Sequence, residues 1–479
     1  MDKQTAAAKK EARRLMMLND PLYKVIPKMA VPTIIAFLIT SIYSLADTYF
    51  VSSLGTNATA AVSVNASLDQ LIMMCGSMLA VGANSYIARL MGEGNDKKAS
   101  QVLSACFFTA FGIGAALMLF GSIFMTPMVR LLGATDTCEQ YSIDYATYVL
   151  MAAPFMAANF VLNQCLRSEG SATLSMVGMG LGGILNCILD PIFIFTFDMG
   201  VAGASLATAI SKLVSFVILI FPYITKRSML QLSIKNVRFS KDIIKEVVSV
   251  GSSSMFRNAL AVVAGILLND IAGNISDSAL AGIGVCTKIM MFPFGIILGF
   301  GNGFQPVAGF NWGAKRYDRV AESYKFSSWT ALIGAAVIAA GLIIFADPLI
   351  LLFAGDDPDM RRIGRLCLIL QCLSLPIHAW VAVVNMLCNA LGNAVGAFLL
   401  ATARQGTCFI PIVHLIAWLL GENGVAGVQA LADVLSLALA IPMAMAMTRK
   451  IRKALTLQTQ TTWDCKKGSE NQSTASSTV

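Results

Sequence analysis

The four residues GVAG occur at 200–203 and again at 424–427 of this 479-residue chain. Other helix-breaking residues recur in the same order: Gly76, Gly82, Gly94, Pro127, Pro154 and Gly170 match Gly295, Gly301, Gly313, Pro348, Pro376 and Gly392. The offset drifts only from 219 to 224 residues, as a few short loop insertions would produce. Glycine and proline are common in membrane helices, but six concordant landmarks in order predict an internal duplication.

The composition is typical of a polytopic membrane protein. Hydrophobic residues make up 56% of the chain and charged residues 13%, whereas soluble domains carry about 25% charged residues; the mean hydropathy is +0.69. A spanning helix needs about 20 mostly apolar residues, and barrel strands would alternate in polarity, which these runs do not. We predict an all-α fold with twelve spans, at 25–51, 61–89, 100–127, 141–167, 171–197, 200–224, 244–272, 279–310, 321–347, 362–391, 394–420 and 424–448.

The duplication divides these spans into two lobes of six. Because six is even, both halves enter the membrane from the same side, so the repeats are parallel and related by an axis along the membrane normal. We expect a cytoplasmic N-terminal segment, an N-lobe, a basic cytoplasmic linker, a C-lobe and a disordered, Ser/Thr/Gln-rich cytoplasmic tail. Their bounds are 1–24, 25–224, 225–243, 244–448 and 449–479.

The net charge of +8 has a topological explanation. The basic residues gather on the loops of one side, before span one and after spans two, six, eight and twelve, whereas the opposite loops carry mainly acids. By the positive-inside rule both termini are cytoplasmic, and nucleic-acid binding is not expected. The first apolar run is too long for a cleavable signal peptide, and the eleven scattered cysteines form no disulfide or metal framework.

Two carboxylates, Asp47 and Asp190, each lie within an apolar span. Both lie about 10 Å below the outer surface, counting 1.5 Å per helical residue. Asn186 is one helical turn from Asp190 on the same face, and Thr208 enters the same layer from span six. An acid in the hydrocarbon region is costly and marks a functional site by default, although one acid alone could cap a helix or face a water-filled vestibule.

Oxygen ligands of this kind suit a hard cation such as Na⁺, while two neighbouring carboxylates could instead hold a proton. We therefore expect Na⁺ or H⁺ as the coupling ion, with no cofactor and no other metal. Pro32 in span one and Pro191, directly after Asp190, are positions where a helix can bend and act as a hinge.

These residues also carry a family resemblance. The segments ADTYFVSSLG at 46–55, LRSEG at 166–170, NCILDPIFIF at 186–195 and GVAGASLAT at 200–208 resemble the multidrug and toxic compound extrusion (MATE) family. The resemblance covers about residues 15 to 450 and implies secondary antiport, in which a cation enters and an organic, often cationic compound leaves. It also implies that Asp47, Asn186, Asp190 and Thr208 form the cation or proton site of the N-lobe, and that Pro32 is a hinge.

The second half departs from part of that family. The NorM-like branch carries acids in spans seven and ten, but span seven here offers Arg257 and span ten runs uncharged from Leu366 onward. The chain therefore resembles the DinF-like branch more closely, and this resemblance implies that the N-lobe site carries the coupling. Lys212, Arg257 and Asp433 are candidate polar residues of the cavity, and Lys212 is a candidate counter-ion for Asp190. His378 and His414 have no acid or cysteine in metal-binding spacing and are interpreted as packed polar residues.

We predict a cation-coupled antiporter of the plasma membrane that exports organic, mainly cationic amphipathic compounds by rocking alternating access. Its partners are a small-molecule substrate and the lipid bilayer, and we expect a monomer. The alternative is a flippase for lipid-linked oligosaccharides or lipids of the same superfamily, which would have a strongly basic cavity. A membrane-embedded enzyme is a further alternative, but the chain has no nucleophile–base pair or metal motif, and we expect no catalytic residues.

Overall fold

The first half of the chain folds into six spanning helices preceded by a short helix. The structure is a computed structural model that describes residues 3–354 and 357–476. The helices of this half are α1 (Lys3–Asn19), α2 (Leu22–Ser52), α3 (Thr56–Gly92), α4 (Asp96–Ile123), α5 (Met125–Leu131), α6 (Glu139–Ser168), α7 (Ala172–Pro191) and α8 (Gly200–Ile224). A π-helical turn, η1 (Ile192–Thr196), follows α7, and a 3-10 turn, η2 (Ile234–Asn236), lies in the linker to the second half.

The second half repeats this pattern. Its helices are α9 (Lys241–Ile275), α10 (Asp277–Gly313), α11 (Tyr317–Ile344), α12 (Ala346–Ala354), α13 (Pro358–Ala390), α14 (Ala394–Thr402) and α15 (Phe409–Ser476), with a π-helical turn, η3 (Ala403–Thr407), between the last two. Gly421, with φ of +56° and ψ of −134°, interrupts α15. The part of α15 before Gly421 forms one span together with α14 and η3, and the part after it forms another. Eleven helices of the described ranges are long and apolar enough to cross a bilayer, and this break makes twelve spans, as predicted.

Repeat-related glycines end equivalent helices in the two halves. Gly170 follows α6 with φ of +73°, and Gly392 follows α13 with φ of +69°. This left-handed conformation is favourable mainly for glycine. The duplication seen in the sequence therefore reflects the same backbone turn used twice, once in each lobe.

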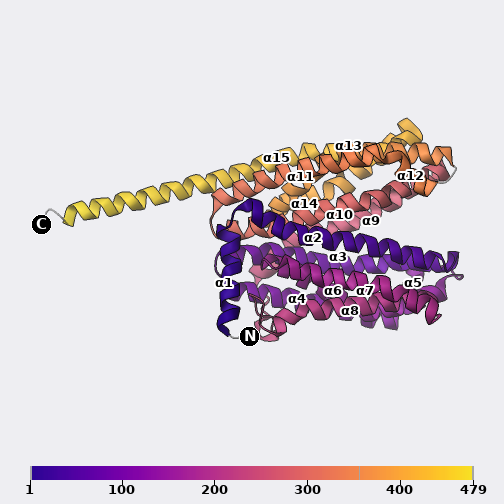
Figure 1. The fold of residues 1–479 in the computed structure, drawn as a ribbon, viewed down its shortest axis with the longest axis horizontal. Coiled ribbons are helices and arrows are strands. Elements are labelled where there is room, and N and C mark those ends of the chain that lie inside the picture. The colour runs from indigo at the N-terminus through magenta and orange to yellow at the C-terminus, as the bar shows by residue number, and fades with distance from the viewer. Residues whose placement is uncertain (1–2, 355–356, 477–479) are drawn as a thin grey trace.

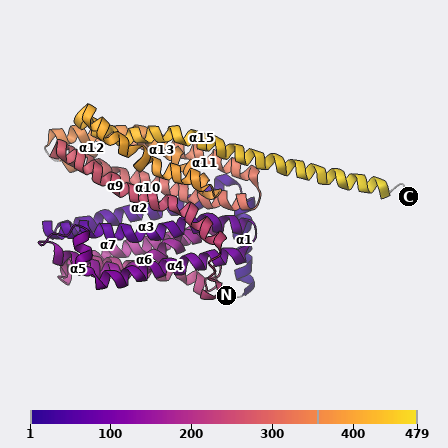
Figure 2. The ribbon, with the colours of Figure 1, turned by 180° about the vertical axis from the view of Figure 1, so that it is seen from behind.

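The helices pack into two groups that correspond to the two halves. Helices α3 to α8 pack mainly around α6, and α9 to α15 pack mainly around α13, whereas α2 packs on α7 of the first group and on α10 of the second. Figure 1 shows the first group in indigo to magenta beside the second in pink to yellow, and Figure 2 shows the same division from behind. The predicted all-α fold of two six-helix lobes is confirmed. We call these groups the N-lobe and the C-lobe.

The lobes meet most closely at the end of the bundle where α1 lies across the helix ends (Figure 1). There α3 packs on α9, and α2 packs on α10. A Cβ atom at Gly313 would lie 1.9 Å from the backbone oxygen of Arg89, and one at Gly251 would lie 2.0 Å from that of Met78. Arg89 also forms an ion pair of 2.7 Å with Glu246 across the lobes. Only backbones without side chains between them can approach so closely.

Toward the opposite end, where α5 and α12 lie, the two groups of ribbons slope away from each other (Figures 1 and 2). On that side of the bundle a Cβ built at Gly265 of α9 or at Gly284 of α10 meets no atom within 4 Å. The closest interlobe contacts are thus confined to the α1 end.

Both ends of the chain are more helical than the sequence analysis expected. The segment 1–24 contains α1, whose Met16 and Met17 are buried against the bundle. The segment 449–479, expected to be disordered, continues α15 as far as Ser476 and extends beyond the bundle (Figure 1). Its sequence has no proline after Pro442, and Lys, Gln, Leu and Ala are good helix formers, so the helix has no stop signal where the apolar run ends.

Candidate functional site

Three of the four predicted site residues are hydrogen-bonded to one another in the N-lobe. The side-chain amide of Asn186 donates to Asp190 Oδ1 at 3.1 Å and to Thr208 Oγ1 at 3.2 Å. Asn186 and Asp190 are one turn apart on α7, and Thr208 comes from the facing helix α8. Asp190 is 0% exposed and Asn186 is 2% exposed. The structure therefore brings a carboxylate, an amide and a hydroxyl together in a dry layer.

Several oxygens of this layer have no hydrogen-bond donor. Asp190 Oδ2, Asn186 Oδ1 and Asp47 Oδ1 are buried and without a partner within the described part of the chain. A buried acceptor without a donor costs about 1–3 kcal/mol. A cation, or a proton on the carboxylate, would supply the missing partner, because Na⁺ is a hard ion that prefers oxygen ligands. The donor set of this layer therefore fits Na⁺ or H⁺.

The fourth predicted residue, Asp47 on α2, is not hydrogen-bonded to this trio. It lies near Lys212, with which it interacts electrostatically, and it also interacts with Asp190. Lys212 donates from Nζ to the Tyr43 hydroxyl at 3.0 Å and lies 5.0 Å from the centre of that ring. Lys212 was a candidate counter-ion for Asp190. The structure instead places it beside Tyr43, close to Asp47 and a third acid.

That third acid is Asp69 on α3, which the sequence analysis missed. Asp69 interacts electrostatically with both Lys212 and Asp47, and its Oδ1 is buried without a hydrogen-bond partner among the described residues. Its signal was available, because it is an acid within the predicted span 61–89. Tyr145 of α6 was missed too: it is 3% exposed and lies within electrostatic reach of all three acids.

The two predicted hinge residues lie inside or at the end of helices. Pro32 is within α2, which runs without interruption through it. Its surroundings pack tightly on α10, since a Cβ at Gly303 would lie 2.4 Å from Ala30. Pro191 is the last residue of α7, and the π-helical turn η1 begins directly after it. Single π-helical turns of this kind are frequent at functional sites.

The remaining candidates, Arg257 and Asp433, lie in the C-lobe. Asp433 of α15 forms an ion pair of 2.7 Å with Arg404 of the π-helical turn η3, a residue that the sequence analysis did not single out. His378, interpreted from the sequence as a packed polar residue, has its Nδ1 3.7 Å from Asp433 Oδ1. The sequence alone could not pair these residues, because they come from three separate helical segments.

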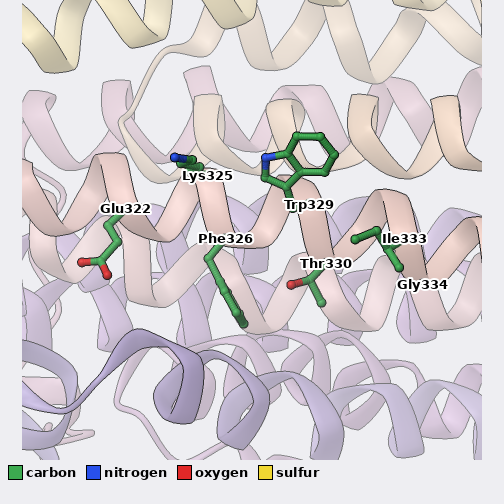
Figure 3. Close-up of a pocket in the computed structure, with 7 residues that line it drawn as sticks. All are labelled: Glu322, Lys325, Phe326, Trp329, Thr330, Ile333 and Gly334. Atoms are coloured by element: carbon green, nitrogen blue, oxygen red, sulfur yellow. The ribbon is translucent and has the colours of Figure 1, made fainter.

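A groove of about 610 Å³ lies outside both polar clusters. Figure 3 shows that its lining comes from one face of α11, from which Trp329 and Phe326 extend in opposite directions. Binding sites in helical proteins are typically enclosed between helices, so we assign this groove to the outer surface of the bundle.

The family model MatE matches this chain in two blocks, residues 32–192 and 253–412. The multidrug export protein MepA of Staphylococcus saprophyticus is 28% identical over 409 residues, covering 85% of this chain and 90% of the relative. MepA of Staphylococcus aureus strain MSSA476 is 27% identical over 408 residues with the same coverage. The two blocks of the family match fall in the N-lobe and the C-lobe, one in each.

Solved structures share the fold. The outward-facing conformation of a multidrug resistance MATE family transporter of the MOP superfamily superimposes with a TM-score of 0.86 at 23% identity, covering 92% of this chain and 98% of that one. A MATE structure in the straight conformation also gives 0.86 at 23% identity, with coverage of 92% and 99%. At this identity the likeness concerns the fold.

Proposed function

The chain belongs to the MatE family of membrane transporters, and we propose that it is an antiporter that exchanges Na⁺ or H⁺ for organic, mainly cationic amphipathic compounds. Family membership makes it a multi-pass transporter and not an enzyme. Its relatives are multidrug export proteins, which supports the proposed export of organic compounds.

The observation that carries the proposal is the charge balance of the N-lobe layer. Three carboxylates, those of Asp47, Asp69 and Asp190, interact electrostatically with one another or with a single base, Lys212. Each of the three has a buried oxygen without a donor among the described residues. Acids inside a membrane protein are retained where they bind ions or protons. A monovalent cation would offset the excess negative charge and satisfy these oxygens.

The interlobe contacts support a rocking mechanism. We propose that the α1 end is cytoplasmic, because the basic loops and both termini lie there and positively charged loops stay inside. The described conformation, closed at the α1 end, would then face outward from the plasma membrane. A cation arriving from outside would enter the N-lobe layer, and rocking of the lobes, with Pro32 and Pro191 as hinges, would expose the site inward.

Coupling requires that the cation and the exported compound affect each other's affinity. If cation binding rearranges α2 and α7 and lowers affinity for the compound, the compound must lower affinity for the cation by the same factor. The hydrogen bond between Asn186 and Asp190 is a candidate for the contact that a cation would change, because both residues carry an oxygen without a donor.

The test is ion-driven transport of a cationic dye by the purified full chain in proteoliposomes. A sodium gradient at clamped pH and a proton gradient without sodium would be applied separately, to identify the coupling ion. We expect Asp190→Asn and Asp47→Asn to abolish gradient-driven dye transport. Asp198→Asn is the matched control, because it makes the same acid-to-amide change at an exposed position next to η1. Full transport by both site variants would defeat the proposal.

A further inference from the structure

The C-lobe contains a second buried polar cluster, separate from the N-lobe layer. Asp433, which is 2% exposed, accepts hydrogen bonds from Arg404 Nε at 2.7 Å and from Ser374 Oγ at 3.1 Å. The Arg404 guanidinium lies 4.2 Å from the centre of the Phe294 ring, and the His378 ring packs edge-on against Phe294, with the two ring centres 5.3 Å apart. Four helical segments thus hold one guanidinium in a fixed orientation.

A second guanidinium lies close to the first. Arg257 of α9 interacts electrostatically with His378, as Arg404 does. Its one hydrogen bond to a side chain runs to Ser254 Oγ at 3.3 Å, and no carboxylate lies within ion-pair distance of it in the part of the chain that the structure describes. An arginine has five N–H donors and no acceptor. Among the described residues, most N–H donors of Arg257 and the Arg404 donors other than Nε have no hydrogen-bond partner. These donors are therefore available to a ligand.

The α9 part of this cluster lies beside the N-lobe. Asn258, the neighbour of Arg257, donates to Ser77 of α3 in the N-lobe at 3.1 Å. Two turns farther along α9, at Gly265, a Cβ would meet no atom within 4 Å. Arg257 is thus positioned where the close interlobe contacts end.

The polar clusters of the two lobes carry opposite charge. The N-lobe layer has three carboxylates and one ammonium group, at Lys212. The C-lobe cluster has two guanidinium groups and one carboxylate, at Asp433. A buried cation without a partner is costly, and a guanidinium recognises a planar oxyanion through paired N–H donors. Positive charge exceeds negative charge in the C-lobe cluster, which favours an anionic ligand there. Negative charge exceeds positive charge in the N-lobe layer, which favours a cation.

We infer that Arg257 and Arg404 form a subsite for a carboxylate or similar oxyanion of the exported compound, so that zwitterionic amphipathic compounds are substrates as well as simple cations. This inference rests on the proposed export function. The ammonium end of such a compound would face the N-lobe acids, and its carboxylate would lie against the two guanidinium groups. Phe294 and His378 would hold Arg404 in position.

The test compares two dyes that differ only at one carboxyl group: tetramethylrhodamine, which carries a free carboxylate, and its methyl ester. Binding to the purified full chain in phosphatidylcholine nanodiscs is measured by fluorescence anisotropy without any ion gradient. We expect Arg257→Gln to weaken binding of the acid dye by about tenfold or more, as loss of charge-assisted hydrogen bonds would. Binding of the ester should change by less than about twofold.

Three further variants keep the test decisive. Arg257→Lys retains the charge but not the planar fork, and should weaken acid-dye binding by less than Arg257→Gln does. Arg404→Gln is combined with Asp433→Asn, so that no buried carboxylate loses its partner, and should also weaken binding of the acid dye selectively. Lys245→Gln removes a positive charge at an exposed position of the same helix and should change neither dye.

Equal loss of both dyes, or no loss in any variant, would overturn the inference. Nanodiscs that contain phosphatidylglycerol distinguish a lipid source of the oxyanion: if this lipid displaces the acid dye from the wild type, the arginines serve a lipid headgroup and the inference is wrong. Failure of gradient-driven transport would count against the antiport proposal and leave the binding comparison unaffected.

Discussion

Replacing Gly313 with alanine should shift the protein away from the conformation in which the lobes meet at the α1 end. The new Cβ would lie 1.9 Å from the backbone oxygen of Arg89 and 2.7 Å from its carbonyl carbon. Both atoms belong to the backbone of α3, so no side-chain rotation relieves the clash. Helices α3 and α10 must separate if the alanine is to fit, and that separation opens the interlobe contact.

The size of the effect follows from the cost of overpacking. An added methylene in a well-packed region costs about 1–3 kcal/mol. The conformation open at the α1 end would not incur this cost, so the ratio of the two conformations should change by about 5- to 150-fold. Gly334→Ala in α11 is the matched control, because a Cβ there meets no atom within 4 Å.

The populations are measured as a distance between the lobes at the α5 and α12 end. Spin labels at Leu131→Cys and Trp418→Cys are suitable, because these side chains are 88% and 81% exposed, in a background without other labelled cysteines. Double electron–electron resonance should show a shift toward shorter distances for Gly313→Ala. If that variant and Gly334→Ala both kept the wild-type distribution, the close contact at Gly313 would not control the equilibrium.

Three more predictions follow from contacts at and beyond this interface. Glu246→Gln removes the interlobe ion pair with Arg89 and should shift the distance distribution in the same direction as Gly313→Ala. The shift should be smaller and should depend on salt concentration, because partly exposed ion pairs contribute about 1 kcal/mol or less. Burial raises the pKa of Glu169, in the turn after α6, so the folded protein binds a proton on this carboxylate more tightly than the unfolded protein does. Thermal stability should therefore fall as pH rises from the ordinary glutamate range through the raised pKa. Glu169→Gln should make thermal stability less dependent on pH in this range. Asp433→Asn leaves the guanidinium of Arg404 without its carboxylate and should cost about 3–5 kcal/mol in thermal unfolding, part of which the added change Arg404→Gln should restore.

The spans were predictable because the bilayer imposes a length and a composition on each helix. The predicted span 25–51 corresponds to Leu22–Ser52, and 200–224 to Gly200–Ile224. The segments outside the bilayer escape this constraint. Helix α1 forms in a stretch with no long apolar run, and it is held by buried contacts of Met16 and Met17 that only the folded bundle supplies.

The candidate site was predictable where sequence spacing fixes geometry. Asn186 and Asp190 are four residues apart on one helix, which places them on one face whatever surrounds that helix. The positions of Asp69 and Lys212 relative to Asp47 could not be predicted in this way. Whether these two side chains face Asp47 depends on how α3 and α8 are rotated about their own axes. The depth of a residue in the membrane does not determine that rotation. In the C-lobe, the π-helical turn η3 rotates Arg404 relative to a regular helix, so its pairing with Asp433 could not be read from helical periodicity.

The duplication explains why the two lobes share a backbone and yet differ in charge. Glycines such as Gly170 and Gly392 are retained as a pair because the turn they form tolerates few other residues. The acids are under no such backbone constraint. At the repeat offset of the nearby glycines, 219 residues, the position of Asp47 is taken by Ile266, and the predicted span 394–420 contains no acid and one base, Arg404. A protein with identical charged layers in both lobes would present two equivalent cation sites. With three acids in the N-lobe layer and two guanidinium groups in the C-lobe cluster, the cation has one layer that fits it, and the C-lobe is left free to bind a different chemical group.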